Sequence, residues 1–341
     1  MFLGDKKEGR EKSEKKGRKV LVKIVILERD SVGEDVSVDC LKELGELAIY
    51  HNTVKEEVKD RIKDANIIVA NKAPINEETM KDASSVKLVC EFATGYDNVD
   101  LEYCKEKGIR VVNVVDYSTA AVAQHTFALC FYILEKLNHY DNYVKSGQYA
   151  AQPRFSNFDI PFTELDGKVW GIVGMGHIGR RVAKIAEAFG CKVIFYSASG
   201  NSKCTEYERV DLETLLKKSD FLSLHCPLSD KTRNLIDLEA LKKMKTSAIL
   251  INVARGPVVN DEALYIALTE NMIAGAGLDV TGTEPMQESN PLSKIMDSNK
   301  LIITPHLAWA SIEARKRVVE ETYKNIQAFY EGKERNVVGN T

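Results

Sequence analysis

The 341-residue chain lacks the cysteine and histidine patterns that hold metals or build disulfide frameworks. Its seven cysteines are an odd number with no C-x-x-C pair, and its six histidines include no H-x-x-x-H pair. Reduced thiols in a cytoplasmic protein fit this usage better than disulfides or zinc do. We therefore expect no metal site and a cytoplasmic location.

Two further absences narrow the class of protein. No apolar run approaches the length that spans a bilayer, so we expect no membrane partner. Lysine and arginine total 47 against 50 acids, and the net charge of -3 gives nucleic acid no electrostatic attraction. A hydrophobic fraction of 44% instead indicates an ordinary globular protein, long enough for two domains.

The first residues carry charge without an apolar pattern. Residues 5–19 read DKKEGREKSEKKGRK, which predicts a disordered, solvated arm over residues 1–18. A basic targeting tail is the alternative. The interspersed acids argue against it, and no apolar signal-peptide core follows.

From Lys19 onward, strand-like and helix-like segments alternate. The near-continuous apolar run KVLVKIVIL at 19–27 is typical of a strand buried on both faces of a parallel sheet. The alternation predicts an α/β unit. Further strands are expected at 47–50, 66–70, 86–90 and 109–113, with helices between them, for instance at 38–44 and 76–82.

A long helix and a second alternating series follow. Residues 118–143 carry apolar residues at helical spacing and no glycine or proline, which predicts one helix preceded by a cap region at Tyr117-Ser118-Thr119. Six strands with intervening helices then predict a full doubly wound sheet. The strands are expected at 168–173, 192–197, 221–225, 248–253, 274–280 and 301–304, and the helices at 177–189, 211–219, 237–244, 261–271 and 311–330.

A glycine-rich turn lies between the first strand and the first helix of this second series. Gly174, Gly176 and Gly179 form a G-x-G-x-x-G motif. The first glycine allows a tight turn, the second lets the backbone approach a pyrophosphate, and the third lets helix and strand pack closely. The strand before and the helix after favour a dinucleotide site over a glycine-rich turn without a ligand.

An acid that usually accompanies this motif is missing. Such an acid, about 20 residues on, binds the ribose hydroxyls of NAD. Ser197 stands in its place, and residues 192–202 contain no acid. Hydroxyls at Ser197, Ser199 and Ser202 with nearby Lys203 would accept a 2′-phosphate, so NADP is one possible cofactor. The alternative is NAD, bound with fewer contacts to its ribose.

Polar residues follow three strands of the same predicted sheet. Arg255 follows one buried strand, Asp279 and Glu284 come with the next, and His306 follows the last. Ligands of open α/β sheets bind outside the carboxyl ends of the strands, so these residues should reach the crevice that the glycine turn also lines.

Their chemistry suits a 2-keto acid. Arginine is a planar donor for a carboxylate beside a carbonyl. Hydride arrival creates an alkoxide that needs a proton, and histidine is the natural acid. A carboxylate beside that histidine fixes the ring and favours its charged form. Taken singly, each residue also has an ordinary structural interpretation.

Several segments in combination resemble the D-isomer-specific 2-hydroxyacid dehydrogenase family, and the resemblance spans about Lys19 to Val338. They are ATGYDNVD (93–100), AVAQHTFAL (121–129), GIVGMGHIGRRVA (171–183), HCPLSDKTRNLI (225–236), INVARGPVVNDEAL (251–264), GLDVTGTEP (277–285) and TPHLAWAS (304–311).

The resemblance assigns roles. It implies that Arg255 orients the substrate, that His306 is the acid/base and that Glu284 is its partner. Thr94, Gly95 and Tyr96 would bind the substrate carboxylate. The implied cofactor-binding residues are Gly174, Met175, Gly176, His177, Ile178, Gly179, Ser197, Cys226, Pro227, Thr232, Val253, Ala254, Arg255, Asp279, His306 and Ala308.

The resemblance also implies an architecture. Two doubly wound parallel-sheet domains, Rossmann- and flavodoxin-like, would have a cleft between them. The substrate-binding domain would comprise 19–118 plus 308–341, and the dinucleotide-binding domain 119–307. The helix at 118–143 resembles a dimer element of the family, which implies a homodimer.

Within the family, the residues favour the glycerate dehydrogenase or hydroxypyruvate reductase branch. Trp309 and the Gln124-His125-Thr126 triplet are similar to that branch, although Trp309 is equally a candidate packing residue. Thr281-Gly282 departs from the bulkier or acidic residues common there. A D-lactate-type or branched-chain hydroxyacid dehydrogenase stays open, as does a dinucleotide-sensing binding protein on the same fold.

Overall fold

The computed structural model describes residues 22–339, which fall into two compact units. One unit contains 22–114 and 319–339, and the other contains 115–318. The predicted arm at 1–18 lies outside the described residues. No helix between residues 22 and 339 is long and apolar enough to cross a membrane.

The first unit is built on a five-stranded parallel sheet with the order β2-β1-β3-β4-β5, which is the flavodoxin-like order. Every residue of β3 and β4 is buried, as the apolar runs predict for strands covered on both faces. The strands are β1 (Lys23–Ile26), β2 (Glu46–Ile49), β3 (Ile67–Ala70), β4 (Leu88–Glu91) and β5 (Arg110–Val112).

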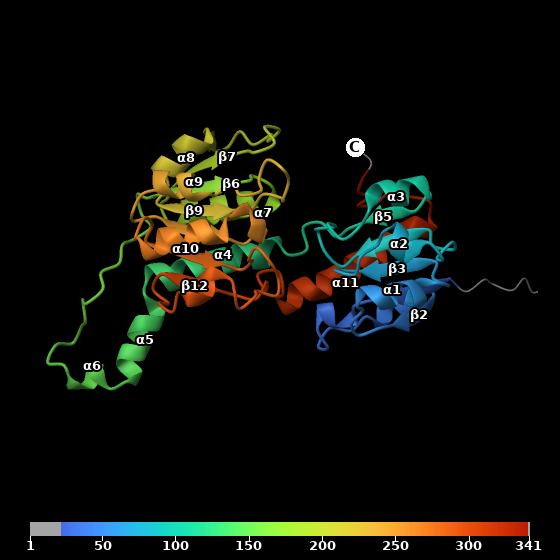
Figure 1. Cartoon of the computed structure of the whole chain (residues 1–341), viewed down its shortest axis with the longest axis horizontal. Helices are drawn as coiled ribbons and strands as arrows, with labels where there is room; N and C mark the ends of the chain where they lie inside the picture. The colour runs from blue at the N-terminus through green and yellow to red at the C-terminus, as the bar shows by residue number, and fades with distance from the viewer. Residues whose placement is uncertain (1–21, 340–341) are drawn as a thin grey trace, which may run out of the picture. The chain divides into compact units, whose positions relative to one another are not determined.

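Short helices connect these strands (Figure 1). They are α1 (Lys55–Ile62), α2 (Glu77–Met80) and α3 (Leu101–Glu106), with 3-10 turns η1 (Arg29–Val32) and η2 (Asp39–Glu43). The helix predicted at 38–44 is therefore only the 3-10 turn η2. The C-terminal helix α11 (Ile312–Tyr330) returns to this unit, where Asn325 Nδ2 donates to the Asn113 carbonyl at 2.9 Å.

The second unit is built on a seven-stranded parallel sheet with the order β12-β11-β10-β9-β6-β7-β8. Six strands match the predicted ones. The seventh, β8, is an exposed two-residue edge strand, too short and polar for a pattern to reveal. The strands are β6 (Val169–Val173), β7 (Lys192–Tyr196), β8 (Glu208–Arg209), β9 (Phe221–Leu224), β10 (Ile249–Asn252), β11 (Gly275–Leu278) and β12 (Leu301–Ile303).

Successive strand residues point to opposite faces of this sheet and contribute side chains to two hydrophobic cores, one on each face. Ile249 and Ile251 pack into one core, and Leu250 between them packs into the other. The first core is covered by α4 (Thr119–Leu134) and α7 (His177–Ala188), and the second by α8 (Leu212–Lys218), α9 (Leu238–Lys243) and α10 (Asp261–Thr269). The prediction of a doubly wound α/β fold is confirmed.

The single helix predicted over 118–143 is wrong. Helix α4 ends at Leu134, Lys136 adopts a left-handed backbone with φ of 55°, and α5 (Leu137–Lys145) begins after it. No glycine or proline marks this break, because a lysine occupies the left-handed position. Helix α5 and the short α6 (Gln148–Ala151) project away from the sheet (Figure 1).

Candidate functional site

The glycine turn after β6 is held against the end of β9. Gly174 has φ of 94°, a backbone that L side chains rarely adopt. A Cβ atom at this position would lie 2.8 Å from the Cys226 backbone nitrogen. One at Gly179 would lie 2.2 Å from the Gly174 carbonyl oxygen, so any side chain there would separate α7 from β6.

Gly176 instead faces open space and caps the start of α7. No atom lies within 4 Å of a Cβ built at Gly176. The first helical hydrogen bond runs from Arg180 N to the Gly176 carbonyl, at 2.9 Å. The amides of residues 177–179 therefore have no carbonyl inside the helix to bond, and they suit an anionic ligand.

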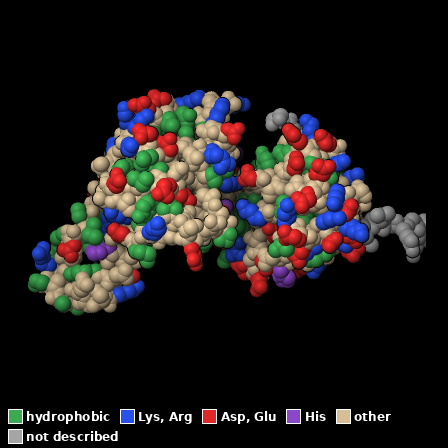
Figure 2. All heavy atoms as spheres, in the orientation of Figure 1, with side chains coloured by type: hydrophobic (Ala, Val, Ile, Leu, Met, Phe, Trp, Pro, Cys, Tyr) green, Lys and Arg blue, Asp and Glu red, His purple; other side chains and the backbone are tan. Residues whose placement is uncertain are grey.

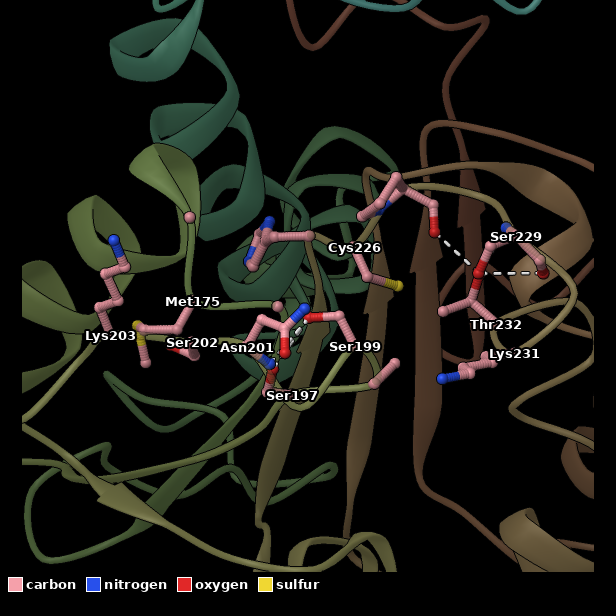
Figure 3. Close-up of a pocket in the computed structure, with 15 residues that line it drawn as sticks. Met175, Ser197, Ser199, Asn201, Ser202, Lys203, Cys226, Ser229, Lys231 and Thr232 are labelled. Atoms are coloured by element: carbon pink, nitrogen blue, oxygen red, sulfur yellow. Dashed lines mark hydrogen bonds between the residues drawn. The ribbon is translucent and has the colours of Figure 1, made fainter. Parts of the chain in front are cut away.

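A cavity of about 570 Å³ opens beside this turn (Figure 3). Its volume is in the range of small-molecule sites. The cavity is lined by Gly174, Met175, Gly176, Ser197, Ala198, Ser199, Asn201, Ser202, Lys203, His225, Cys226, Pro227, Ser229, Lys231 and Thr232.

The polar lining of the cavity contains cations and hydroxyls but no carboxylate. Ser197, at the end of β7, is buried, and its hydroxyl lies 3.5 Å from the Ser199 hydroxyl. Figure 3 draws Lys203 and Lys231 on opposite sides of these serines. An anionic group would find positive charge here and no repelling acid.

The residues at the end of β9, His225 and Cys226, form another wall of the cavity, and both side chains are neutral. His225 Nε2 lies 3.0 Å from Ser223 Oγ, which accepts a hydrogen bond from Trp170 Nε1 at 2.9 Å. Burial lowers the pKa of the His225 imidazole to about 3 and raises the pKa of the Cys226 thiol to about 11. Thr232 Oγ1 donates to the Pro227 carbonyl at 2.8 Å, which closes the loop.

The glycine turn, the first-turn amides and the cationic lining together fit a dinucleotide. The pyrophosphate would meet the amides of α7, and the adenosine half would occupy the cavity between Ser197 and Thr232.

Three polar residues predicted to act together follow neighbouring strands. Arg255 follows β10, Glu284 follows β11 and His306 follows β12, and these strands pair in parallel. His306 Nδ1 lies 2.6 Å from Glu284 Oε2. The sequence separates the two residues, and the sheet brings them together.

A glycine keeps the arginine turn close to the glutamate turn. A Cβ at Gly256 would lie 1.6 Å from the Thr281 carbonyl oxygen, so no side chain fits there. Gly282, in the turn that departs from the family pattern, donates its N–H to Asp261 Oδ2 at 3.1 Å. Both turns therefore have fixed backbones.

Asp279 holds the turn that carries His306. Its carbonyl accepts the His306 N–H at 2.9 Å, and its carboxylate accepts the N–H groups of Leu307 at 2.9 Å and Ala308 at 2.8 Å. His306 has φ of 54°, a left-handed conformation that costs energy in a non-glycine residue. These three bonds offset that cost.

Arg255 lies near a buried tyrosine. Arg255 Nη1 donates to the Ala254 carbonyl at 2.8 Å. Burial raises the pKa of Tyr117 to about 12, and the charge of Arg255 opposes that shift. The Tyr117 ring packs edge-on against Trp309, with centroids 6.3 Å apart, so Trp309 has a packing role within this unit.

The predicted carboxylate-binding turn, Thr94–Tyr96, lies in the other unit, after β4. Thr94 Oγ1 donates to the Val114 carbonyl and the Thr94 carbonyl accepts from Asn113 Nδ2, both at 2.7 Å. Asn98 Nδ2 donates to the Ala73 carbonyl at 3.0 Å and to Glu91 Oε1 at 3.2 Å. Burial raises the pKa of the Glu91 carboxyl to about 8.

The predicted cofactor residues divide into three groups. Gly174, Met175, Gly176, Ser197, Cys226, Pro227 and Thr232 line the cavity. His177, Ile178 and Gly179 form the first turn of α7, and Val253, Ala254, Arg255, Asp279, His306 and Ala308 follow β10, β11 and β12.

Sequence reasoning missed Ala198, Asn201, Ser229 and Lys231 as cavity residues. Ser229 and Lys231 lie inside the segment 225–236, where the sequence pattern does not indicate which side chains face a ligand. Asn201 lies in an irregular loop that no periodicity describes. Among residues 22–339, no group of three metal-ligating side chains lies close enough together to hold a metal.

Comparison with known proteins identifies a family model over much of the chain. Residues 127–308 match the model described as D-isomer specific 2-hydroxyacid dehydrogenase, NAD binding domain. The resemblance drawn from the motifs is thereby confirmed.

Relatives extend the similarity to nearly full length. A hydroxypyruvate reductase of Blautia hydrogenotrophica is 39% identical over 324 residues, covering 93% of this chain and 99% of its own. A glycerate dehydrogenase of Methylorubrum extorquens is 40% identical over 317 residues, covering 93% and 98%. The crystal structure of a D-lactate dehydrogenase from Aquifex aeolicus, complexed with NAD and lactic acid, superimposes with a TM-score of 0.82 at 31% identity, covering 94% and 100%.

Proposed function

Because the chain belongs to the D-isomer specific 2-hydroxyacid dehydrogenase family, we propose that it interconverts hydroxypyruvate and D-glycerate. A bound nicotinamide dinucleotide would supply the hydride to the keto carbon, and a proton from the protein would complete the hydroxyl group. The observation that carries this proposal is the 2.6 Å contact between His306 and Glu284, beside the turn of Arg255.

His306 is the proton donor in this reaction. The Glu284 carboxylate accepts a hydrogen bond from the N–H at Nδ1, which leaves Nε2 to exchange a proton with the substrate oxygen. The negative charge of Glu284 stabilises the charged ring before the proton is transferred. In the oxidative direction the same nitrogen accepts the proton from the hydroxyl.

Arg255 binds the substrate carboxylate in this proposal. The guanidinium offers two parallel donors to the carboxylate and the adjacent carbonyl oxygen. Thr94, Gly95 and Tyr96 are proposed separately, from the family resemblance, as substrate-binding residues of the other unit. The unit formed by 22–114 and 319–339 would then be the substrate-binding domain, and 115–318 the dinucleotide-binding domain. This assignment follows the position of the glycine turn and the cavity in the second unit.

The cavity lining favours acceptance of NADPH alongside NADH. Ser197 replaces the acid that would repel a 2′-phosphate, and Lys203 and Lys231 contribute positive charge. NADH lacks this phosphate, but its pyrophosphate would still meet the amides of α7. We therefore expect the two cofactors to have KM values within about tenfold of each other.

The projecting segment supports a homodimer. Phe155 and Phe158, in the loop after α6, are 91% and 74% exposed. Leu137, Val144 and Phe162 are also at least half exposed. Figure 2 shows hydrophobic side chains on the projection that contains α5 and α6. We propose that a second copy of the chain packs against this segment, because exposed apolar side chains gathered on one segment often mark a protein–protein interface. Changing Phe155 and Phe158 to serine should produce monomers in sedimentation experiments.

Cysteine usage supports a reducing compartment. All seven cysteines are free thiols, and six of them are buried. We propose the cytoplasm on this ground.

The deciding experiment is oxidation of NADH and NADPH followed by absorbance. Hydroxypyruvate, glyoxylate, pyruvate, phosphohydroxypyruvate and 2-ketoisocaproate are compared in parallel. Preferred turnover of hydroxypyruvate supports the proposal. Preference for pyruvate or 2-ketoisocaproate would move the protein to the D-lactate-type or branched-chain alternative, and cofactor binding without any turnover would favour the dinucleotide sensor.

A further inference from the structure

A line of polar side chains lies behind the turn that carries His306. His125, on helix α4, places Nε2 2.9 Å from Thr304 Oγ1, which follows β12. Thr304 Oγ1 donates to Asp279 Oδ1 at 2.6 Å. The His125 ring nitrogen itself lies 3.5 Å from the same carboxylate oxygen, too far for a good direct bond.

The number of available protons determines which group donates each hydrogen bond in this line of side chains. The Thr304 hydroxyl has one proton, and the 2.6 Å bond to Asp279 uses it. His125 must then donate from Nε2 to the hydroxyl oxygen, which requires the tautomer protonated at that nitrogen. Burial lowers the pKa of His125, against the opposing effect of Asp279, so the ring is held neutral.

The line ends on the backbone of the His306 turn. Asp279 receives the Thr304 hydroxyl and the Leu307 N–H on Oδ1, and the Ala308 N–H on Oδ2. The orientation of the carboxylate therefore sets the positions of the two amides that follow His306. Because the left-handed backbone of His306 is strained, loss of this support should let the turn relax.

We propose that His125 is a positioning residue for His306 and acts through Thr304 and Asp279. Its role in catalysis rests on the proposed function, in which His306 transfers the proton. A shift of the His306 ring by about 1 Å would move Nε2 out of line with the substrate oxygen, and such shifts lower turnover by one to two orders of magnitude.

Matched variants of the full-length protein test this line. His125→Leu removes the donor at similar volume, and His125→Gln retains an N–H donor at a similar reach. Thr304→Val removes the hydroxyl, and Thr304→Ser restores it. Gln124→Ala, at an exposed position of the same helix, is the control.

The first readout is amide hydrogen exchange of residues 304–309 without cofactor or substrate. We expect faster exchange at Leu307 and Ala308 in H125L and T304V, and wild-type protection in H125Q, T304S and Q124A. The second readout is steady-state kinetics. We expect kcat to fall about tenfold in H125L and T304V with little change in KM, and to recover in H125Q and T304S.

Two results would overturn the proposal. One is unchanged exchange at Leu307 and Ala308 in both H125L and T304V. The other is a loss in H125Q as large as that in H125L, which would mean that the ring fills space and its N–H donor is dispensable. A failure of the proposed function can be distinguished from a failure of this proposal. In that case the wild-type protein would show no turnover, while the exchange measurements would still test whether His125 supports the His306 turn.

Discussion

His306 Nδ1 lies 2.6 Å from Glu284 Oε2, although 22 positions separate the two residues in the sequence. One ring nitrogen therefore contacts the protein, and in the proposed reaction the other exchanges a proton with the substrate. Glu284 Oε1 also accepts the Thr281 N–H at 3.3 Å, which ties the carboxylate to its own turn.

Replacing His306 with glutamine should remove proton transfer while leaving the fold intact. We expect kcat to fall by about 10² to 10⁴, the usual contribution of a general acid. Binding of NADH, followed by quenching of tryptophan fluorescence, should be unchanged within about threefold. A loss of less than tenfold in kcat would remove His306 from the proposed mechanism.

Glu284→Gln should affect turnover more than substrate binding. The amide oxygen still accepts from Nδ1, so the ring stays oriented, but the negative charge that stabilises the charged ring is lost. We expect kcat to fall about ten- to a hundredfold with KM for hydroxypyruvate changed less than about threefold. Glu288→Gln, an exposed acid of the same loop, serves as the control. A change confined to KM would contradict the role given to Glu284.

Arg255→Lys should weaken substrate binding without affecting the cofactor. Lysine keeps the charge but loses the two parallel donors that match a carboxylate. We expect kcat/KM for the keto acid to fall about ten- to a hundredfold and NADH affinity to stay the same. The exposed Arg154→Lys variant should show neither change. Wild-type kinetics in R255K would exclude a bidentate contact.

Ser197→Asp should turn the cofactor preference toward NADH. The new carboxylate would bind the ribose hydroxyls and repel a 2′-phosphate. We expect the ratio of kcat/KM for NADPH to that for NADH to fall at least about tenfold. Ser197→Ala, which adds no charge, separates repulsion from the loss of the hydroxyl. An unchanged ratio in S197D would place the phosphate-binding region elsewhere.

Glu91 should make stability depend on pH. Burial raises the pKa of its carboxyl from 4.5 to about 8, so the folded chain keeps a proton that the unfolded chain releases. The free energy of unfolding contributed by this group therefore falls as pH rises from about 4.5 to about 8, then levels off. Glu91→Gln removes this dependence, and we expect it to stabilise the protein at pH 7 by about 1 to 3 kcal/mol.

Urea unfolding at pH 5, 6, 7 and 8 measures this effect. The difference between E91Q and wild type should grow across the series. The exposed Glu102→Gln of the same unit should leave the curve unchanged. A constant difference between E91Q and wild type would mean that Glu91 is already charged in the folded protein.

The sequence predicted the strands well because their signal is local. Buried parallel strands are short apolar runs, and β3 and β4 are buried at every residue. The break after α4 was not predictable in the same way. Lys136 has a left-handed backbone conformation, which is not expected for a lysine. The edge strand β8 has too few residues to form a recognisable pattern.

The same distinction holds for the candidate site. His306 and Glu284 could be paired from their places after adjacent strands, because parallel strands end at a common edge. His125 could not be joined to them, since its contact with Thr304 crosses 179 positions and depends on how α4 packs over β12. Lys231 faces the cavity through an irregular loop, where side-chain direction follows no period.

Gly256 has a consequence for engineering this protein. The backbone of the arginine turn touches that of the glutamate turn at a position that tolerates no side chain. Libraries that randomise the residues around Arg255 would lose nearly all members altered at Gly256, whatever their chemistry. Attempts to broaden the substrate scope should therefore keep Gly256 unchanged and vary other positions near Arg255.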